Sequence, residues 1–244
     1  MQNLAFSYEK EKEILHNIDF QIPEGKFVAL VGESGCGKST IAGLLLGKNK
    51  GYQGKITIGG VELSEIQEKS LMKNFTGVSH NSYLFKGTVR DNLLMGNPNA
   101  TDEELLEALK KVKLYDFLME EQGLDTYLSE KASNLSGGQC QRLALARALL
   151  HDTPIYIFDE ATSNIDVESE EAIMEQIYDL AKAKTVILIS HRLANVVEAD
   201  NIIVLSDGDI VEQGTHDILM KKQGTYANMM QAQMKLENYG KGCR

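Results

Sequence analysis

The segment GESGCGKS, residues 32–39, has the residue types and spacing of a phosphate-binding loop. Its glycines and the pair Lys38-Ser39 fit the pattern G-x-x-x-x-G-K-[ST]. Glycines let the backbone turn so that successive N–H groups point at one anion. Lys38 is long enough to reach β and γ phosphates, and the Ser39 hydroxyl is a suitable Mg²⁺ ligand. The residues expected to contact a nucleotide here are Gly32, Glu33, Ser34, Gly35, Cys36, Gly37, Lys38, Ser39 and Thr40.

The segments on either side of this loop favour a phosphate-binding loop over a chance glycine-rich turn. Residues 27–31 are an uncharged apolar run, as in a buried parallel strand. An apolar helical segment starts at Thr40, and the N-terminal end of a helix is positive. This order of strand, loop and helix predicts that the chain binds a nucleoside triphosphate.

Two carboxylates follow a second apolar strand, predicted over residues 155–158. Ligands of α/β sheets bind at the carboxyl ends of parallel strands, where Asp159 and Glu160 stand. Asp159 could hold Mg²⁺, and Glu160 could polarise an attacking water. The alternative is a solvated acidic turn, which we disfavour because the phosphate loop needs an acidic partner for its Mg²⁺.

A histidine follows a third apolar strand, predicted over residues 185–189. A lone histidine is usually structural. His191, however, stands at the same kind of strand end as Asp159, so we predict that it contacts the γ-phosphate.

A second helix N-terminus lies at the sequence LSGGQ, residues 135–139. Ser136 and Gln139 have the spacing of a capping box, and a long helix is predicted to follow through Leu150. A serine with two glycines also suits an anion. Capping alone favours the simpler interpretation of a well-capped helix.

The other patterns predict the elements that position these residues. A turn at 23–25 and a hairpin over 55–63 with Gly59-Gly60 as its loop predict an antiparallel β-layer around the phosphate loop. Tyr8 lies in this layer, either stacked on a base or as a half-buried strand residue. Further predictions are a capping box at 101–104 ahead of a helix, a hairpin over 202–211, and a helix over 226–236 with a frayed end at 240–244.

Composition narrows the class of protein. The chain has 244 residues, 43% of them hydrophobic, which allows one large α/β domain or two small lobes. Its net charge of −10 argues against a nucleic-acid partner. The three cysteines, Cys36, Cys140 and Cys243, have neither metal-ligand spacing nor an even number for disulfide pairing, which favours a reducing, cytosolic compartment. We find neither an apolar run long enough for a membrane span nor a signal-peptide core.

Taken together, these residues resemble the nucleotide-binding domain of ATP-binding cassette (ABC) transporters over nearly the whole chain. The resemblance depends on the Walker A loop 32–39, the signature LSGGQ, and the Walker B end 155–160. It extends to SNID at 163–166, similar to the D-loop, and to His191 at the switch position. Since the signature between two Walker motifs is specific to this family, the functional interpretation of Ser136 replaces the simple cap.

The resemblance implies a fold and its parts. The fold would be α/β, a RecA-like P-loop core with an N-terminal antiparallel β-layer and an inserted α-helical subdomain. Residues 1–80 would hold the β-layer and P-loop, and 81–150 the helical subdomain with the signature. Residues 151–244 would supply the rest of the core.

The resemblance also implies a mechanism with ATP and Mg²⁺ as cofactors. Two domains would pair head to tail, and each ATP would lie between one Walker A loop and the signature of the other domain. Tyr8 would stack on adenine, Lys38, Ser39 and Thr40 would hold phosphates and Mg²⁺, and Asp159 would support the metal. Glu160 would be the general base and His191 would contact the γ-phosphate. From the other domain, residues Ser136, Gly137, Gly138 and Gln139 would close the site, and Asp166 would contact the partner.

Three segments resemble exporters in particular: residues 83–92, 191–193 and 211–216. The expected partner is the transmembrane domain of an exporter, upstream in the same chain or in a separate subunit. The start close to Tyr8 favours an excised domain. The resemblance places it at the cytoplasmic side of the cell membrane, attached through transmembrane domains, with the fragment itself soluble.

Two positions depart from the family pattern. His80 stands where the Q-loop usually has glutamine, and neutral imidazole is a poor Mg²⁺ ligand. It either weakens Mg²⁺ coordination and adds pH sensitivity, or only links the lobes. Before the signature, Ser129 and Ala132 flank Glu130 where exporters usually have glycines, which makes coupling through this loop less certain.

Cys36 lies inside the phosphate loop, and two interpretations stay open for it. Modification of the thiol would block ATP binding, with bound ATP protecting it, or the thiol is buried and inert. Two alternative functions also stay open: a soluble ABC ATPase, and a regulatory cassette with weak hydrolysis.

Overall fold

The computed structural model describes residues 1–9 and 12–241 and divides the chain into two compact units. Unit 1 comprises Met1–Phe75 and Thr185–Arg244, and unit 2 comprises Thr76–Lys184. Cys243 and the other two residues of the C-terminus lie outside the described residues. The predicted helical subdomain, residues 81–150, falls within unit 2, while the division into three parts remains a prediction.

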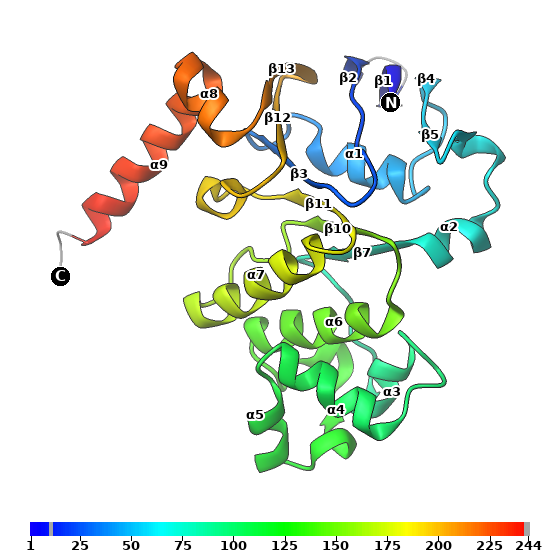
Figure 1. Cartoon of the computed structure of the whole chain (residues 1–244). Coiled ribbons are helices and arrows are strands. Elements are labelled where there is room, and N and C mark those ends of the chain that lie inside the picture. The colour runs from blue at the N-terminus through cyan, green and yellow to red at the C-terminus, as the bar shows by residue number, and fades with distance from the viewer. Residues whose placement is uncertain (10–11, 242–244) are drawn as a thin grey trace. The chain divides into compact units, whose positions relative to one another are not determined.

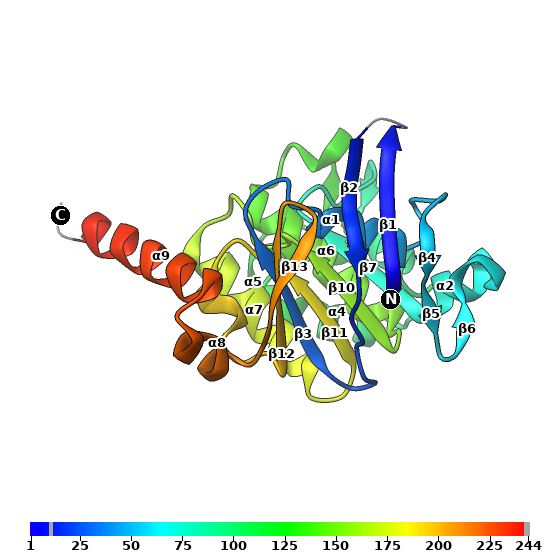
Figure 2. The same ribbon diagram turned by 90° about the horizontal axis from the view of Figure 1, so that it is seen from above.

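The core of unit 1 is a run of hydrogen-bonded strands around β3 (Phe27–Gly32), which lies between β12 (Asn201–Ser206) and β11 (Thr185–Ile189) and is parallel to both. All six residues of β3 are buried, as its uncharged apolar sequence predicts. β13 (Asp209–Gly214) pairs antiparallel with β12 (Figure 2). The strands predicted at 27–31 and 185–189 and the hairpin at 202–211 are therefore confirmed.

An antiparallel layer in the same unit has the order β2-β1-β4. Its strands are β1 (Gln2–Glu9), β2 (Lys12–Ile18) and β4 (Gln53–Lys55). Figure 2 shows β1 and β2 side by side. β5 (Thr57–Ile58) and β6 (Val61–Glu62) form the predicted hairpin, whose loop is Gly59-Gly60.

The longest helix of unit 1 is α9 (Thr225–Lys241), which follows α8 (His216–Lys222) and is red in Figure 1. The helix predicted at 226–236 is confirmed. Fraying from residue 240 is wrong for residues 240 and 241, which are helical, and residues 242–244 lie outside the described part of the chain. The remaining helices of the unit are α1 (Lys38–Leu45), α2 (Glu68–Asn74) and the 3₁₀ helices η1 (Leu63–Glu65) and η4 (Leu193–Val196).

Unit 2 contains the predicted strand at 155–158 as β10 (Ile155–Asp159), which lies beside β7 (Phe75–Ser79). A short antiparallel pair joins β8 (Gly87–Thr88) to β9 (Tyr127–Leu128). Its helices are α3 (Val89–Leu94), α4 (Asp102–Lys111), α5 (Tyr115–Glu120), α6 (Gly137–His151), α7 (Val167–Ala181), η2 (Gly123–Asp125) and η3 (Glu130–Ala132).

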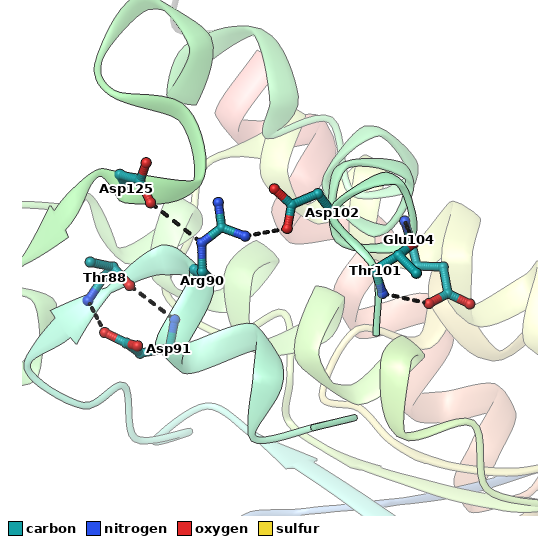
Figure 3. Close-up of polar contacts among 7 residues, drawn as sticks. All are labelled: Thr88, Arg90, Asp91, Thr101, Asp102, Glu104 and Asp125. Atoms are coloured by element: carbon teal, nitrogen blue, oxygen red, sulfur yellow. Dashed lines mark hydrogen bonds and ion pairs between the residues drawn. The ribbon is translucent and has the colours of Figure 1, made fainter. Parts of the chain in front are cut away.

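Side chains cap four helices of unit 2, α3, α4, α6 and α7, and the guanidinium of Arg90 links three of its segments. The predicted capping boxes at Thr101 and Ser136 are both present, and Thr88 forms a third with Asp91 (Figure 3). The guanidinium of Arg90 in α3 donates to Asp102 at the start of α4 and, over 3.4 Å, to Asp125 in η2 (Figure 3). Each box satisfies N–H groups that a helix start leaves without helical partners. The local sequence therefore sets where these helices begin.

A membrane-spanning segment would need a long apolar helix. Across residues 1–9 and 12–241, none of the helices has both the length and the apolar character to cross a bilayer.

Candidate functional site

The predicted phosphate loop connects β3 to α1, and its glycines have backbone conformations that other residues rarely adopt. Gly32, Gly35 and Gly37 have φ values of 148°, 84° and 104°. A Cβ at Gly32 would lie 2.2 Å from the carbonyl oxygen of Leu205, and one at Gly37 would lie 2.5 Å from a methyl carbon of Leu15. A Cβ at Gly35 would meet no atom within 4 Å, so the outer part of the loop is open. The glycine spacing read from the sequence is therefore a steric requirement of this turn.

Lys38 is the first residue of α1 and only 3% exposed. Its Nζ donates to the carbonyl oxygens of Gly32 at 2.9 Å and Glu33 at 2.7 Å, and lies 3.6 Å from the Sγ of Cys36. The loop backbone thus holds the ammonium group beneath the turn. Because Cys36 is only 5% exposed, the structure gives its thiol the burial that the inert interpretation requires.

Tyr8 in β1 is tied to the start of α1. The residue is 61% exposed, and its ring makes an edge contact with Phe6 at 4.9 Å between centroids. Its hydroxyl lies 3.2 Å from the Oγ1 of Thr40 and accepts a hydrogen bond of 3.2 Å from the Nδ2 of Asn49. An exposed ring with an anchored hydroxyl suits base stacking better than the alternative of a half-buried strand residue. Asn49 was not identified from the sequence, since no local pattern links it to Tyr8.

His191 follows β11, the parallel neighbour of β3, with Ile189 opposite Leu30. Parallel strands end at the same edge of a sheet, so His191 and the phosphate loop lie at one edge of the sheet of unit 1. The side chain of His191 is exposed. The hydroxyl of Ser190 accepts a 3.0 Å bond from the N–H of Arg192, which shapes the turn after the histidine.

In unit 2, the predicted carboxylates end β10, and His80 follows the neighbouring strand β7. The backbone N–H of His80 donates to the carbonyl oxygen of Asp159 over 3.2 Å, so the Q-loop position and the Walker B end are adjacent. Glu160 has a φ of 54°, a left-handed conformation that carries strain for a residue other than glycine. Such strain tends to be retained where it aims a functional side chain.

The side chain of His80 bonds to its neighbour, and its backbone bonds to the signature helix. Its Nε2 lies 2.8 Å from the Nδ2 of Asn81. The carbonyl oxygen of His80 accepts a hydrogen bond from the amide of Gln141, a buried residue of α6 that sequence reasoning missed. Sequence distance explains the omission, because Gln141 lies 61 positions from His80.

The signature residues begin α6 and lie against the D-loop. The Ser136 hydroxyl accepts from the N–H of Gln139 at 3.2 Å, and Gln139 Oε1 accepts from the N–H of Ser136 at 2.8 Å. A Cβ at Gly138 would lie 2.2 Å from Ser169 Oγ and 2.6 Å from a carboxylate oxygen of Asp166. Only glycine permits this approach of the starts of α6 and α7.

Asp166 is the N-cap of α7. Its carboxylate accepts from the N–H and the hydroxyl of Ser169, both at 2.8 Å. These bonds favour the ionised form, the backbone bond most, and hold the pKa of Asp166 below its usual value. Ser169 was missed from the sequence, although its position three residues after Asp166 is a capping signal.

The loop before the signature is one of the two places where the sequence departs from the family pattern. Two of its residues have a left-handed backbone conformation. Ala132 has a φ of 50° and Lys131 one of 57°, whereas Ser129 is extended with a φ of −68°. Left-handed geometry favours glycine, the residue that the resemblance to exporters led us to expect at the position of Ala132. Asn134 accepts from the N–H of Ser129 at 2.9 Å and donates to the carbonyl of Tyr127 at 3.0 Å, which closes the loop.

The donor chemistry fits the predicted metal. Ser39 and Asp159 offer a hydroxyl and a carboxylate, and Mg²⁺ prefers oxygen ligands. Within the described residues, no group of three or more histidine, cysteine, aspartate or glutamate side chains could hold a metal alone. Phosphate and water oxygens would have to complete the coordination shell, as is usual for Mg²⁺.

A family model described as ABC transporter matches residues 15–163. An uncharacterized ABC transporter ATP-binding protein of Haemophilus influenzae is 50% identical over 237 residues, which are 97% of this chain and 42% of that protein. An ATP-dependent lipid A-core flippase of Vibrio vulnificus is 43% identical over 236 residues, which are 96% of this chain and 40% of that protein.

A solved structure of a bacterial Atm1-family ABC exporter with ATP bound superposes with a TM-score of 0.90 at 38% identity. It covers 95% of this chain, and the chain covers 41% of it. The α/β fold expected from the sequence is therefore confirmed, and so is the resemblance to exporters. The chain spans about two fifths of the length of these relatives. Since the family model covers more than half of it, the chain belongs to the ABC transporter family and is similar to the ATP-binding part of the family's exporters.

Proposed function

We propose that this chain binds and hydrolyses ATP and that hydrolysis drives an exporter. The observation that carries the proposal is the phosphate loop, in which three left-handed glycines precede a helix and the loop backbone holds the Lys38 ammonium. Such a loop binds phosphates through N–H groups, the helix N-terminus and the lysine together.

Each predicted residue has a role toward the nucleotide. Tyr8 stacks on adenine, with its hydroxyl anchored at Thr40. Lys38 neutralises charge on the β and γ phosphates. Ser39 and Asp159 would each supply an oxygen to Mg²⁺, which would offset further charge on the phosphates. Thr40 and the remaining loop residues bind the phosphates through their backbone, as the N–H groups of such loops do.

Hydrolysis needs a water, a base and a group that senses the γ-phosphate. Glu160 accepts the proton of the water that attacks γ-phosphorus, and the bond to the ADP oxygen breaks. His191 donates a hydrogen bond to the γ-phosphate. The backbone N–H of His80 donates to the carbonyl oxygen of Asp159, which brings the His80 position next to the proposed metal ligand.

The proposed catalytic assembly contains two domains in head-to-tail orientation. Ser136 and Gly138 of one domain close on the γ-phosphate that the other domain binds, and Asp166 contacts the partner. The exposed position of Ser136 at the start of α6 supports this role. ATP binding would bring the domains together and hydrolysis would release them, which moves the attached transmembrane domain at the cytoplasmic side of the membrane.

The decisive experiment is ATP-dependent dimerisation of the Glu160→Gln variant in analytical ultracentrifugation. Removal of the base should trap ATP between two domains, so the variant should sediment as a dimer with Mg-ATP and as a monomer without it. The matched control carries Lys38→Ala as well and should remain a monomer. A Glu160→Gln protein that stays monomeric at saturating Mg-ATP and high protein concentration would overturn the shared-site proposal.

Steady-state hydrolysis separates a transport ATPase from a regulatory cassette. The wild-type chain should release phosphate from ATP, and Glu160→Gln should lose at least about 100-fold of that rate, as expected for loss of a general base. Equal rates in the two proteins would contradict hydrolysis by Glu160. His80→Gln should change the Mg²⁺ dependence of the rate, and an unchanged dependence would restrict His80 to a linking role.

A further inference from the structure

The side-chain amide of Gln233, in the C-terminal helix α9, bonds to the backbone of both His191 and Leu193. These two residues lie on either side of Arg192. The Nε2 of Gln233 in α9 donates to the carbonyl oxygen of His191, and its Oε1 accepts from the N–H of Leu193 at 2.9 Å. Gln233 lies 42 positions from His191 in sequence. The proposed mechanism gives this residue no role.

One of these bonds satisfies a backbone N–H at a helix start. Leu193 is the first residue of η4, and a helix start leaves its N–H without a helical partner. Arg192, the N-cap, forms no side-chain cap on η4 among the described residues. Leu193 is itself fully buried, so an unsatisfied N–H at this point would be costly. Gln233 therefore fixes the backbone on both sides of Arg192, immediately after the switch histidine.

The position of Gln233 is set by the way α9 is attached to unit 1. Glu212 of β13 accepts hydrogen bonds from the N–H groups of Thr225 at 2.8 Å and Tyr226 at 3.0 Å, at the start of the helix. Tyr226 is fully buried and its hydroxyl lies 2.9 Å from Nδ1 of His216. Burial raises the pKa of Tyr226 to about 12, so this phenol remains a neutral hydrogen-bonding group.

The same face of α9 carries Gln233. Tyr226, Met230 and Gln233 are spaced by four and three residues, which places them on one side of a helix. Tyr226 and Met230 are buried, whereas Gln231 on another side is exposed. The apolar pair thus docks the helix, and the amide one turn later reaches the loop that bears His191.

We infer that Gln233 is a positioning residue for hydrolysis: it holds the backbone at His191 so that the imidazole meets the γ-phosphate. The inference rests on the proposed role of His191 and adds the C-terminal helix to the parts on which catalysis depends. Gln233 contacts no phosphate-loop residue through the bonds described here and acts through His191. A displacement of the histidine of about 1 Å can cost a large factor in rate, although binding of ATP at the phosphate loop is unaffected.

Hydrogen exchange tests the structural part without any need for activity. In the full chain, the amide of Leu193 should exchange at least about 10-fold faster in Gln233→Ala than in the wild type, because the accepted bond is removed. Gln233→Glu keeps an acceptor for that amide but cannot donate to His191, so Leu193 should stay protected. The matched control is Gln231→Ala, an exposed glutamine of the same helix, which should leave exchange at Leu193 unchanged. Equal exchange in Gln233→Ala and the wild type would overturn the inference.

Kinetics test the catalytic part. Gln233→Ala and Gln233→Glu should both lower kcat by about 10-fold and leave the KM for ATP within about twofold, because the lost contact orients the histidine rather than the nucleotide. Gln231→Ala should retain both parameters. A purely structural defect would instead lower the amount of active protein. It would not produce a Gln233→Glu variant in which the Leu193 amide stays protected from exchange but kcat falls.

A double-mutant cycle shows whether Gln233 acts through His191. In a His191→Ala background, Gln233→Ala should reduce kcat no further, since the side chain that it positions is gone. An additional 10-fold loss would overturn action through His191. If His191→Ala alone hydrolyses ATP as fast as the wild type, the proposed role of His191 fails and the catalytic part fails with it. A slow His191→Ala beside a fully active Gln233→Ala would overturn this inference and leave the proposed function standing.

Discussion

Two helices of this protein begin at segments suited to an anion, and they begin in different ways. At α1 the N-cap is Gly37 in a left-handed conformation, without a side-chain cap among the described residues. At α6 the N-cap is Ser136 in an extended conformation, and a complete capping box satisfies the first turn. The first turn of α1 therefore has no side-chain cap among the described residues, whereas that of α6 is capped by its own residues.

The two helix starts depend on different parts of the fold. The turn before α1 depends on packing from distant segments. Leu205 of β12 lies against Gly32, and Leu15 of β2 lies against Gly37. The start of α6 depends on residues within four positions and on its neighbour Asp166. The phosphate loop is thus built by the core of unit 1. At the start of α6, by contrast, the cap at Ser136 is local and exposed, and the buried Gly138 depends on packing against α7.

The largest difference in stability is expected between alanine variants of two glycines, Gly32 before α1 and Gly137 at the start of α6. Gly32→Ala should destabilise the protein by about 3 kcal/mol or more, because the new Cβ would meet a backbone oxygen at a strained φ. Gly137→Ala at the other helix should change stability by less than about 1 kcal/mol, since the nearest atom is at 3.9 Å. Denaturant unfolding of both variants measures this contrast, and similar losses would show that both starts depend on core packing.

A second contrast separates capping from ligand contact at Ser136. Ser136→Ala should lose about 1 kcal/mol of stability, and Ser136→Asp should retain stability because aspartate is an equally good N-cap. The aspartate would nevertheless place a negative charge where a phosphate is proposed, so ATP-dependent dimerisation of a Glu160→Gln protein should be lost. Unfolding and sedimentation of the same samples measure the two effects. A Ser136→Asp protein that still dimerises with ATP would restrict Ser136 to its capping role.

A third contrast uses pH at Asp166. The folded-state pKa of Asp166 is lowered, chiefly by the N–H of Ser169, so its stabilisation is complete above the unfolded value of about 4. That stabilisation is lost as pH falls through the lower folded-state pKa. Asp166→Asn should match the wild type at pH 7, because asparagine is also a good N-cap, and should lose less stability between pH 5 and pH 2. Parallel pH dependence of the two unfolding free energies would contradict this account.

The smallest effect concerns the strained loop before the signature. Lys131→Gly should stabilise the chain by about 0.5 kcal/mol, because relief of the left-handed strain outweighs the entropy that glycine loses on folding. Thermal unfolding measures this gain. Ser129→Gly is the matched control and should destabilise, since Ser129 is extended and needs no glycine.

Several parts of the site could be predicted from the sequence because local rules define them. The capping boxes at Thr101 and Ser136, the hairpin loop Gly59-Gly60 and the strand before the phosphate loop all follow from residues within a few positions. The contacts of Asn49, Gln141 and Gln233 could not be predicted, because their partners lie 41, 61 and 42 positions away. No local periodicity encodes such a distance.

The sequence by itself determined the glycine spacing, the helix caps, the strand ends that carry Asp159 and His191, and hence the kind of chemistry. The tertiary structure alone decided that Gly32 and Gly138 have no room for a Cβ and that Gln233 bonds to the backbone of His191 and Leu193. The physical reason is the range of the interactions. Turn and cap preferences act between neighbours in the chain, whereas steric exclusion and the satisfaction of buried polar groups depend on segments that only folding brings together.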